Sequence, residues 1–178
     1  RAPRFSCDDK AAEAVVRGRL EALHLLRMPG GVGSLSHPSV AEGNGVFHEP
    51  IAFSAPAILR EVRWLADPTL GRGILRLFFD NLRQNGMVPG RVYMTSMTGT
   101  DFYHADWGGG FESFDDVHPD RNLKRQVIMG MQRYTKWLAN NRDPEGSGLT
   151  DVCNHFEAGQ EFSRRYTIID EKADRAEE

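Results

Sequence analysis

The sequence predicts an all-α protein built from helical hairpins. Four long stretches carry apolar residues at the three- and four-residue spacing of an amphipathic helix, and the strict alternation of a half-buried strand is almost absent. Segments rich in glycine, proline and polar residues separate these stretches, as expected for loops that join helices. We expect the four helices over residues 6–28, 50–66, 67–85 and 119–141.

Composition places the chain among ordinary globular domains. It has 178 residues, 40% of them hydrophobic, which is enough for one domain with a real core. The formal net charge of -3 gives no electrostatic case for binding nucleic acid. No apolar run approaches the roughly 20 residues of a membrane span. Cys7 and Cys153 fit two free thiols or a single disulfide, and they match no zinc pattern. We expect no metal and no cofactor.

The first two helices are predicted from their start signals. Ser6 and Asp9 resemble a capping box, and an apolar stripe follows them. Residues 30–47, rich in glycine and serine, form a long loop, and loops beyond about 12–15 residues often carry function. Pro50 then stands near the first position of the second helix, with His48 and Glu49 just before it.

The third and fourth helices begin at Asp67 and Pro119. Between them, residues 94–118 form a loop region dense in aromatic and acidic residues. This mixture suits a sugar, whose ring has apolar faces and a polar rim. The candidates for stacking and hydrogen bonding are Phe102, Tyr103, His104, Asp106, Trp107, Phe111, Glu112, Phe114, Asp115 and Asp116.

The densest chemistry lies in residues 154–166, NHFEAGQEFSRRY. Glu157 and Glu161 stand four residues apart, which on a helix would place both carboxylates on one face. Repulsion between them would raise one pKa, as a general acid requires. The same glutamates beside Arg164 and Arg165 also fit a solvated helix face with exposed ion pairs. These residues alone leave both interpretations open.

The block EAGQEFSRRY resembles the ESGWDFSSRW-like signature of trehalases and the WESG-type segment of processing α-glucosidases and mannosylglycerate hydrolases. In that group the carboxylate two residues after the glycine is the general acid, which corresponds here to Glu161. Gln160 replaces a tryptophan and Glu161 an aspartate. NGMVPGRVY, which contains Arg91, resembles the GxIPNGxRxYY stretch of trehalases, whereas FHEP stands where those enzymes carry a tryptophan and an aspartate.

The resemblance covers about residues 47–166 and implies part of an (α/α)6 toroid. Twelve helices of roughly 11–12 residues with their loops exceed this chain. We therefore expect residues 1–178 to be a single domain or a fragment of a larger catalytic toroid, completed by the rest of the same protein or by another chain. Residues 170–178 are expected to be a charged, solvated tail. An oligosaccharide or polysaccharide substrate would fit a secreted or periplasmic protein.

The resemblance implies an inverting glycosidase with Glu161 as general acid. No segment matches the base of that group, and Asp106 and Glu49 are substitutes for it. From the resemblance and from side-chain chemistry together, we expect substrate binding by Glu157, Arg91, Trp107, Asp106, His48, Glu49 and Arg165.

Two other functions stay open. Lyase or epimerase chemistry on the same toroid would use Tyr103, His104 or His155 as base. A non-catalytic helical interaction module would need no such base, and it predicts no stabilisation by sugars.

Overall fold

The computed structural model describes residues 4–45, 47–95, 99 and 101–159. Within these ranges the chain forms mainly helices, which confirms the all-α class and is consistent with part of an (α/α)6 toroid. No helix of the described residues is long and apolar enough to cross a membrane. In chain order the elements are α1 (Lys10–Leu25), β1 (Arg27–Met28), β2 (Ser39–Val40), α2 (Ala55–Val62), α3 (Thr69–Asp80), α4 (Trp107–Asp115), α5 (Arg121–Asn141) and the 3-10 helix η1 (His155–Ala158).

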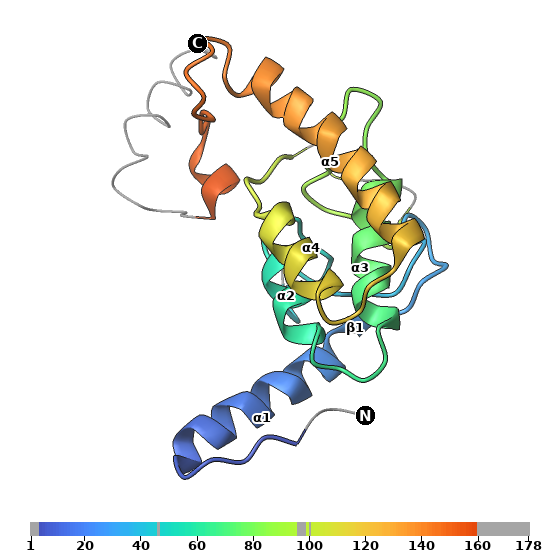
Figure 1. Ribbon diagram of the computed structural model, residues 1–178, viewed down its shortest axis with the longest axis vertical. Coiled ribbons are helices and arrows are strands. Elements are labelled where there is room, and N and C mark those ends of the chain that lie inside the picture. Colours follow the sequence, from blue (N-terminus) through green and yellow to red (C-terminus); the bar gives the residue numbers. More distant parts are fainter. Residues whose placement is uncertain (1–3, 46, 96–98, 100, 160–178) are drawn as a thin grey trace.

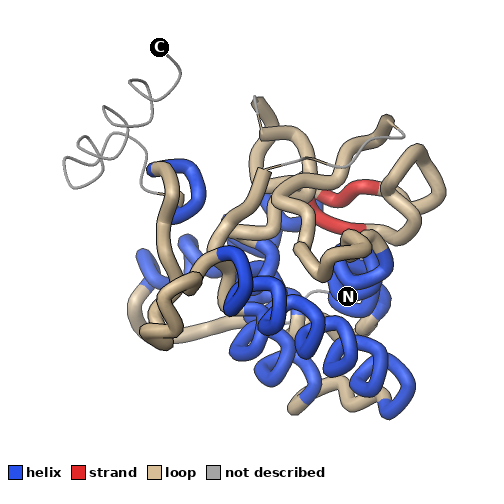
Figure 2. The backbone as a smooth tube through the Cα atoms, turned by 90° about the horizontal axis from the view of Figure 1, so that it is seen from above, coloured by secondary structure: helices blue, strands red, loops and turns tan. Residues whose placement is uncertain are grey.

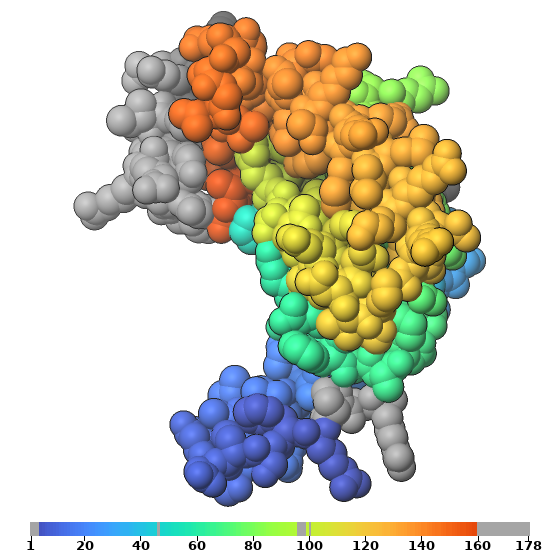
Figure 3. Space-filling view, in the orientation of Figure 1, coloured from blue at the N-terminus to red at the C-terminus, as the bar shows by residue number. Residues whose placement is uncertain are grey.

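Helices α2 to α5 pack together around the core, whereas α1 projects away from them (Figure 1, Figure 3). The closest neighbours are α2 with α4 and α3 with α5. Phe78, Trp107 and Phe114 fill the centre of the core, with at most 2% of each residue exposed. Most loops and the two short strands lie on one side of the helices (Figure 2).

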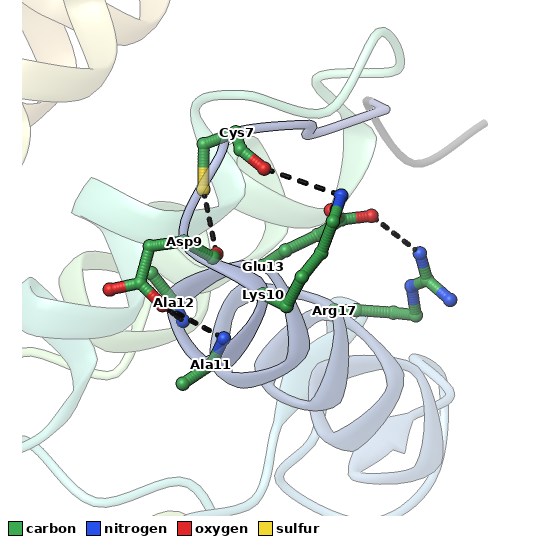
Figure 4. Close-up of polar contacts among 7 residues, drawn as sticks. All are labelled: Cys7, Asp9, Lys10, Ala11, Ala12, Glu13 and Arg17. Atoms are coloured by element: carbon green, nitrogen blue, oxygen red, sulfur yellow. Dashed lines mark hydrogen bonds and ion pairs between the residues drawn. The ribbon is translucent and has the colours of Figure 1, made fainter.

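Helix α1 begins three residues later than the capping box predicted. Asp9, not Ser6, is the N-cap, and its Oδ1 accepts hydrogen bonds from the backbone N–H groups of Ala11 and Ala12 (Figure 4). Leu23 packs into the core, and Arg19 makes a bidentate ion pair with Glu61 of α2 at 2.8 Å. The helix is therefore attached to the rest mainly near its C-terminal half.

The second helix also begins later than expected, at Ala55 instead of Pro50. The backbone of residues 50–52 pairs with residues 90–92, so it is not free to form helical hydrogen bonds. Ala52 N–H donates to the Gly90 carbonyl at 2.8 Å, and Val92 N–H donates to the Pro50 carbonyl at 3.1 Å. Glu49 therefore lies beside an extended segment instead of at a helix start. The strands β1 and β2, which pair Arg27 with Val40, were not expected either.

Helix α4 lies inside the region predicted as a polar-aromatic loop. Asp106 is its N-cap and accepts from Gly109 N–H at 2.9 Å. A Cβ at Gly110 would lie 2.7 Å from Pro56 of α2, so this glycine allows close packing of the two helices. Trp107, Phe111 and Phe114 face the core together, which corrects their assignment to a loop.

The third and fourth predicted helices are confirmed with shorter bounds. Helix α3 ends at Asp80, where the Asn81 side chain donates to the Leu77 carbonyl at 2.8 Å, five residues before the predicted end. Helix α5 starts after Asp120, whose Oδ1 accepts from Asn122 N–H and Leu123 N–H at 3.1 Å.

We expect Asp120→Ala to lower the free energy of unfolding by about 1 kcal/mol at pH 7, because an N-cap is lost. Hydrogen bonding to Leu123 N–H and the charge of Arg72 hold the pKa of Asp120 below its usual value. Its stabilising effect is present above the unfolded pKa of about 3.9 and is lost as the pH falls through the lower folded value. Urea unfolding at pH 7 and below pH 3 measures the difference. Glu145→Ala, in an exposed turn, is the control and should change little; an equal loss in both variants would contradict the prediction.

Candidate active site

Arg91 is the centre of a first polar network. Its Nε lies 2.7 Å from Asp101 Oδ2, its Nη2 donates to the Tyr103 hydroxyl at 2.8 Å, and its Nη1 donates to Glu49 Oε1 at 3.3 Å. The phenyl ring of Phe47 lies over the guanidinium, 5.3 Å from Cζ to the ring centroid. Two separate segments of the chain, residues 47–49 and 101–103, thus fix one arginine, which fits a side chain held ready for a ligand.

Backbone pairing explains why these side chains meet. Gly90 N–H donates to the Asp101 carbonyl, and Gly99 N–H donates to the Arg91 carbonyl, both at 2.9 Å. A Cβ at Gly90 would lie 2.7 Å from the Tyr103 ring, so the two extended segments approach closely only because this residue is glycine.

Glu157 is the centre of a second network, and its side chain is only 5% exposed. Its Oε1 accepts from Arg142 Nη2 at 2.7 Å, and its Oε2 accepts from the backbone N–H of Cys153 at 2.9 Å. Its carbonyl accepts from His104 N–H at 2.7 Å. The carboxylate therefore binds the protein's own groups and holds the turn of η1, which makes Glu157 a candidate positioning residue.

Arg142 joins this turn to the core. It follows the last residue of α5, and its guanidinium lies over the rings of Phe102 and Trp137, at 5.1 Å and 5.2 Å from their centroids. Cation–π contacts and a buried ion pair then act on the same side chain. Sequence reasoning missed Arg142, because a single arginine after a helix matches no motif.

A cavity of about 400 Å³ connects the two networks. Arg91, Asp101 and Tyr103 of the first network line it together with Arg142 and Glu157 of the second. This volume is typical of a small-molecule site, and several polar groups converge on it. A larger hollow of about 1070 Å³ lies beside α1. Its walls contain none of the residues that the sequence suggested for catalysis or substrate binding, so the smaller cavity is the candidate site.

The structure separates several residues that the sequence grouped together. Trp107 is 2% exposed and packs against Phe78 and Phe79 in the core, so its ring is not presented to a sugar. His48 is exposed, with Nδ1 3.2 Å from the Gly43 carbonyl. Of the other binding candidates, Arg91 and Glu49 lie together in the first network. Glu161 and Arg165, like residues 170–178, lie outside the described residues.

Asp106 has a structural task. Besides capping α4, it forms an ion pair with Arg60. The hydrogen bond from Gly109 N–H and this ion pair lower the pKa of Asp106 below its usual value. Asp106 is not part of the cavity lining.

The two cysteines are described by their ionisation and pairing. Burial and the neighbouring charge of Glu157 raise the pKa of Cys153, which disfavours its thiolate. Cys7 and Cys153 are both free thiols, as in the first of the two expectations. Within the described ranges, no three histidine, cysteine, aspartate or glutamate side chains gather as metal ligands do.

A family model for the mannosylglycerate hydrolase MGH1-like glycoside hydrolase domain matches residues 50–178, more than half of the chain. The chain therefore belongs to the MGH1-like glycoside hydrolase domain family. This confirms the resemblance that began from EAGQEFSRRY, and both networks except Phe47 and Glu49 lie inside the matched range. The comparisons with curated proteins and with solved structures gave no significant match.

We expect Arg91→Met to lower the free energy of unfolding by about 2 kcal/mol. Removing one partner of a buried pair costs about 3–5 kcal/mol, and the partial exposure of this site reduces the effect. The side chains of Arg91 and Glu49 are 23% and 12% exposed, so the Glu49 carboxylate would lose its partner while it is largely buried from solvent. Urea unfolding measures the loss.

Arg60→Met is the matched control, because it removes an exposed arginine whose partner Asp106 is 63% exposed. That variant should lose less than about 1 kcal/mol. Equal losses in the two variants would show that Arg91 is not a structural centre.

Proposed function

We propose that this chain hydrolyses the glycosidic bond of an oligosaccharide or polysaccharide by acid/base catalysis with inversion, and that Glu161 is the general acid. The observation that carries the proposal is the buried Glu157–Arg142 ion pair, with its 2.7 Å contact. This pair fixes the η1 turn at the wall of the polar cavity, and Glu161 follows Glu157 by four residues. Membership of a glycoside hydrolase family supports the reaction class.

The proposed reaction needs a proton donor and an activated water. Glu161 would protonate the glycosidic oxygen as the bond to the anomeric carbon breaks, and a second carboxylate would take a proton from the attacking water. In inverting enzymes the two carboxyl groups lie roughly 6.5–9.5 Å apart. We propose that the base comes from another part of the full-length protein or from another chain. Arg91, held by Asp101 and Tyr103, would donate hydrogen bonds to sugar hydroxyls.

Tyr103 is poorly suited to act as the base of an elimination mechanism. Burial raises the pKa of Tyr103 although the hydrogen bond from Arg91 opposes it, so the phenol is protonated near neutral pH and is a poor base. His104 Nε2 lies 3.0 Å from the Asp151 carbonyl, which only accepts hydrogen bonds. In this hydrogen bond Nε2 carries the proton, so Nδ1 would be the nitrogen that acts as a base.

The experiment is hydrolysis of a panel of α- and β-glycosides, mannosylglycerate included, by the full-length gene product. ¹H NMR at early times gives the anomeric configuration of the first sugar released. We expect hydrolysis with inversion, so that an α-glycoside releases a β-sugar. Release with the original configuration would overturn the inverting mechanism. An unsaturated product would indicate a lyase, and the absence of any product would overturn the proposed activity.

A further inference from the structure

The exposed aromatic rings of the described residues are not spread evenly over the surface. They are Phe5, Phe47, Phe53, Trp64 and Phe156. Three of the five lie close to the cavity or to the two networks that line it, although they come from distant parts of the chain. We call Phe47, Phe53 and Phe156 the aromatic rim.

Each ring of the aromatic rim has a defined neighbour at the site. Phe156 lines the cavity itself, and Phe47 lies over the guanidinium of Arg91, which also lines it. Phe53 lies against the η1 turn, because a Cβ at Gly159 would come within 2.6 Å of its ring. Phe156 and Phe47 therefore lie beside polar groups of the cavity, and Phe53 lies beside the turn that carries Phe156.

The aromatic rim is unusual because its rings are exposed to solvent. Phe47, Phe53 and Phe156 are 41%, 43% and 51% exposed, whereas Phe102 and Trp107, which the sequence suggested for stacking, are at most 5% exposed. A single exposed apolar residue needs no explanation, but an apolar cluster rimmed by polar groups marks a binding surface. A sugar ring fits such a surface, with its C–H face on an aromatic ring and its hydroxyls on polar side chains.

The ring of Phe156 is also held in place. It belongs to η1, whose N-cap Asn154 accepts from Glu157 N–H at 3.2 Å. The next residue is the buried Glu157, and the His155 ring lies 4.0 Å from the phenyl ring, centroid to centroid. A platform fixed in this way loses little conformational freedom when a ligand covers it.

We propose that the aromatic rim binds the sugar rings of an oligosaccharide by stacking, with Phe156 against the ring inside the cavity and Phe47 and Phe53 against its neighbours. A pyranose has two faces, so three separate platforms serve more than one sugar unit. The preferred substrate is then an oligosaccharide and not a single sugar joined to a small acid or alcohol. This inference rests on the proposed function.

The test measures binding separately from turnover. Titration calorimetry on the full-length protein with Glu161→Gln uses methyl α-glucoside and methyl α-mannoside beside α-linked gluco- and manno-oligosaccharides of two to four units. For one series, we expect affinity to rise with length and Phe156→Ala to raise Kd about tenfold, or 1.4 kcal/mol. Phe156→Tyr should retain the affinity and Phe156→Leu should lose it, because the face of a ring is required.

Trp64→Ala is the control, since Trp64 is exposed and its ring lies beside Arg63 of the same segment. Unchanged Kd in the rim variants, equal affinity for one and several sugar units, or no binding by any of these sugars would overturn the inference. So would a large loss of thermal stability in Phe47→Ala or Phe53→Ala, which would show that these rings serve mainly to stabilise the fold. Failure of the proposed function is distinct: the Glu161→Gln protein would then turn over substrate like the wild type.

Discussion

We expect Glu161→Gln, at the proposed general acid, to lower kcat on a natural glycoside by about 10²–10⁴-fold, the usual contribution of such a group. The amide has nearly the shape of the carboxylic acid but does not donate its proton to a departing alkoxide. The binding of sugar and the fold should be unchanged. Initial rates at saturating substrate, beside thermal unfolding, measure both.

A glycosyl fluoride makes this experiment specific for acid catalysis. Fluoride leaves without protonation, so Glu161→Gln should retain most of its activity on this substrate. Glu145→Gln, which changes an exposed glutamate in the preceding turn, is the control and should behave as wild type. Equal losses on the fluoride and the natural glycoside would show that Glu161 is not the acid.

We expect Glu157→Ala to lower the free energy of unfolding by about 3 kcal/mol, because it leaves the mostly buried guanidinium of Arg142 without its partner. The side chain of Arg142 is 18% exposed, and the backbone N–H of Cys153 loses its acceptor as well. We also expect at least about a tenfold lower kcat, since a displacement of about 1 Å at a catalytic group can cost about 10²-fold. Urea unfolding and initial rates measure the two effects.

A double-mutant cycle separates the ion pair from other effects of the substitution. Glu157→Leu with Arg142→Met removes both charges, so the double variant should be more stable than the sum of the single losses predicts. Additive losses would contradict the importance of the pair. Full activity in Glu157→Ala would contradict its positioning role.

The helices with regular apolar stripes were predictable, and their exact starts were not. Helix α5 keeps its spacing over the full length, so periodicity alone locates it. The start of α2 depends on backbone pairing of residues 50–52 with 90–92, a contact between distant segments that leaves no local pattern. Tertiary hydrogen bonding here overrides the start signal of Pro50.

Helix α4 was missed although a signal was present. Three consecutive glycines, residues 108–110, argue against a helix, because glycine is a poor helix former. Trp107, Phe111 and Phe114, however, stand four and three residues apart, which is the spacing of a buried helix face. Close packing of Gly110 on Pro56 offsets the low helix propensity of the glycines, and this contact cannot be read from local sequence.

The site was predictable only in part, for a similar reason. Motif order pointed to Arg91 and Glu157, and both line the cavity. Arg142 carries no motif, and Phe156 became informative only when its exposure beside polar groups was known. Charge compensation and exposure depend on neighbours in space, so they cannot be read from a short stretch of sequence.

The position of Arg142 couples two properties that are usually separate. The η1 turn has little regular structure of its own, and it gains its order from a guanidinium that rests on Trp137 of α5 and on Phe102. Local unfolding at the C-terminal end of α5 would therefore release the η1 turn while the centre of the core stays folded. Unfolding of this helix end would then also abolish the proposed activity. The free energy of this local unfolding would be lower than that of global unfolding.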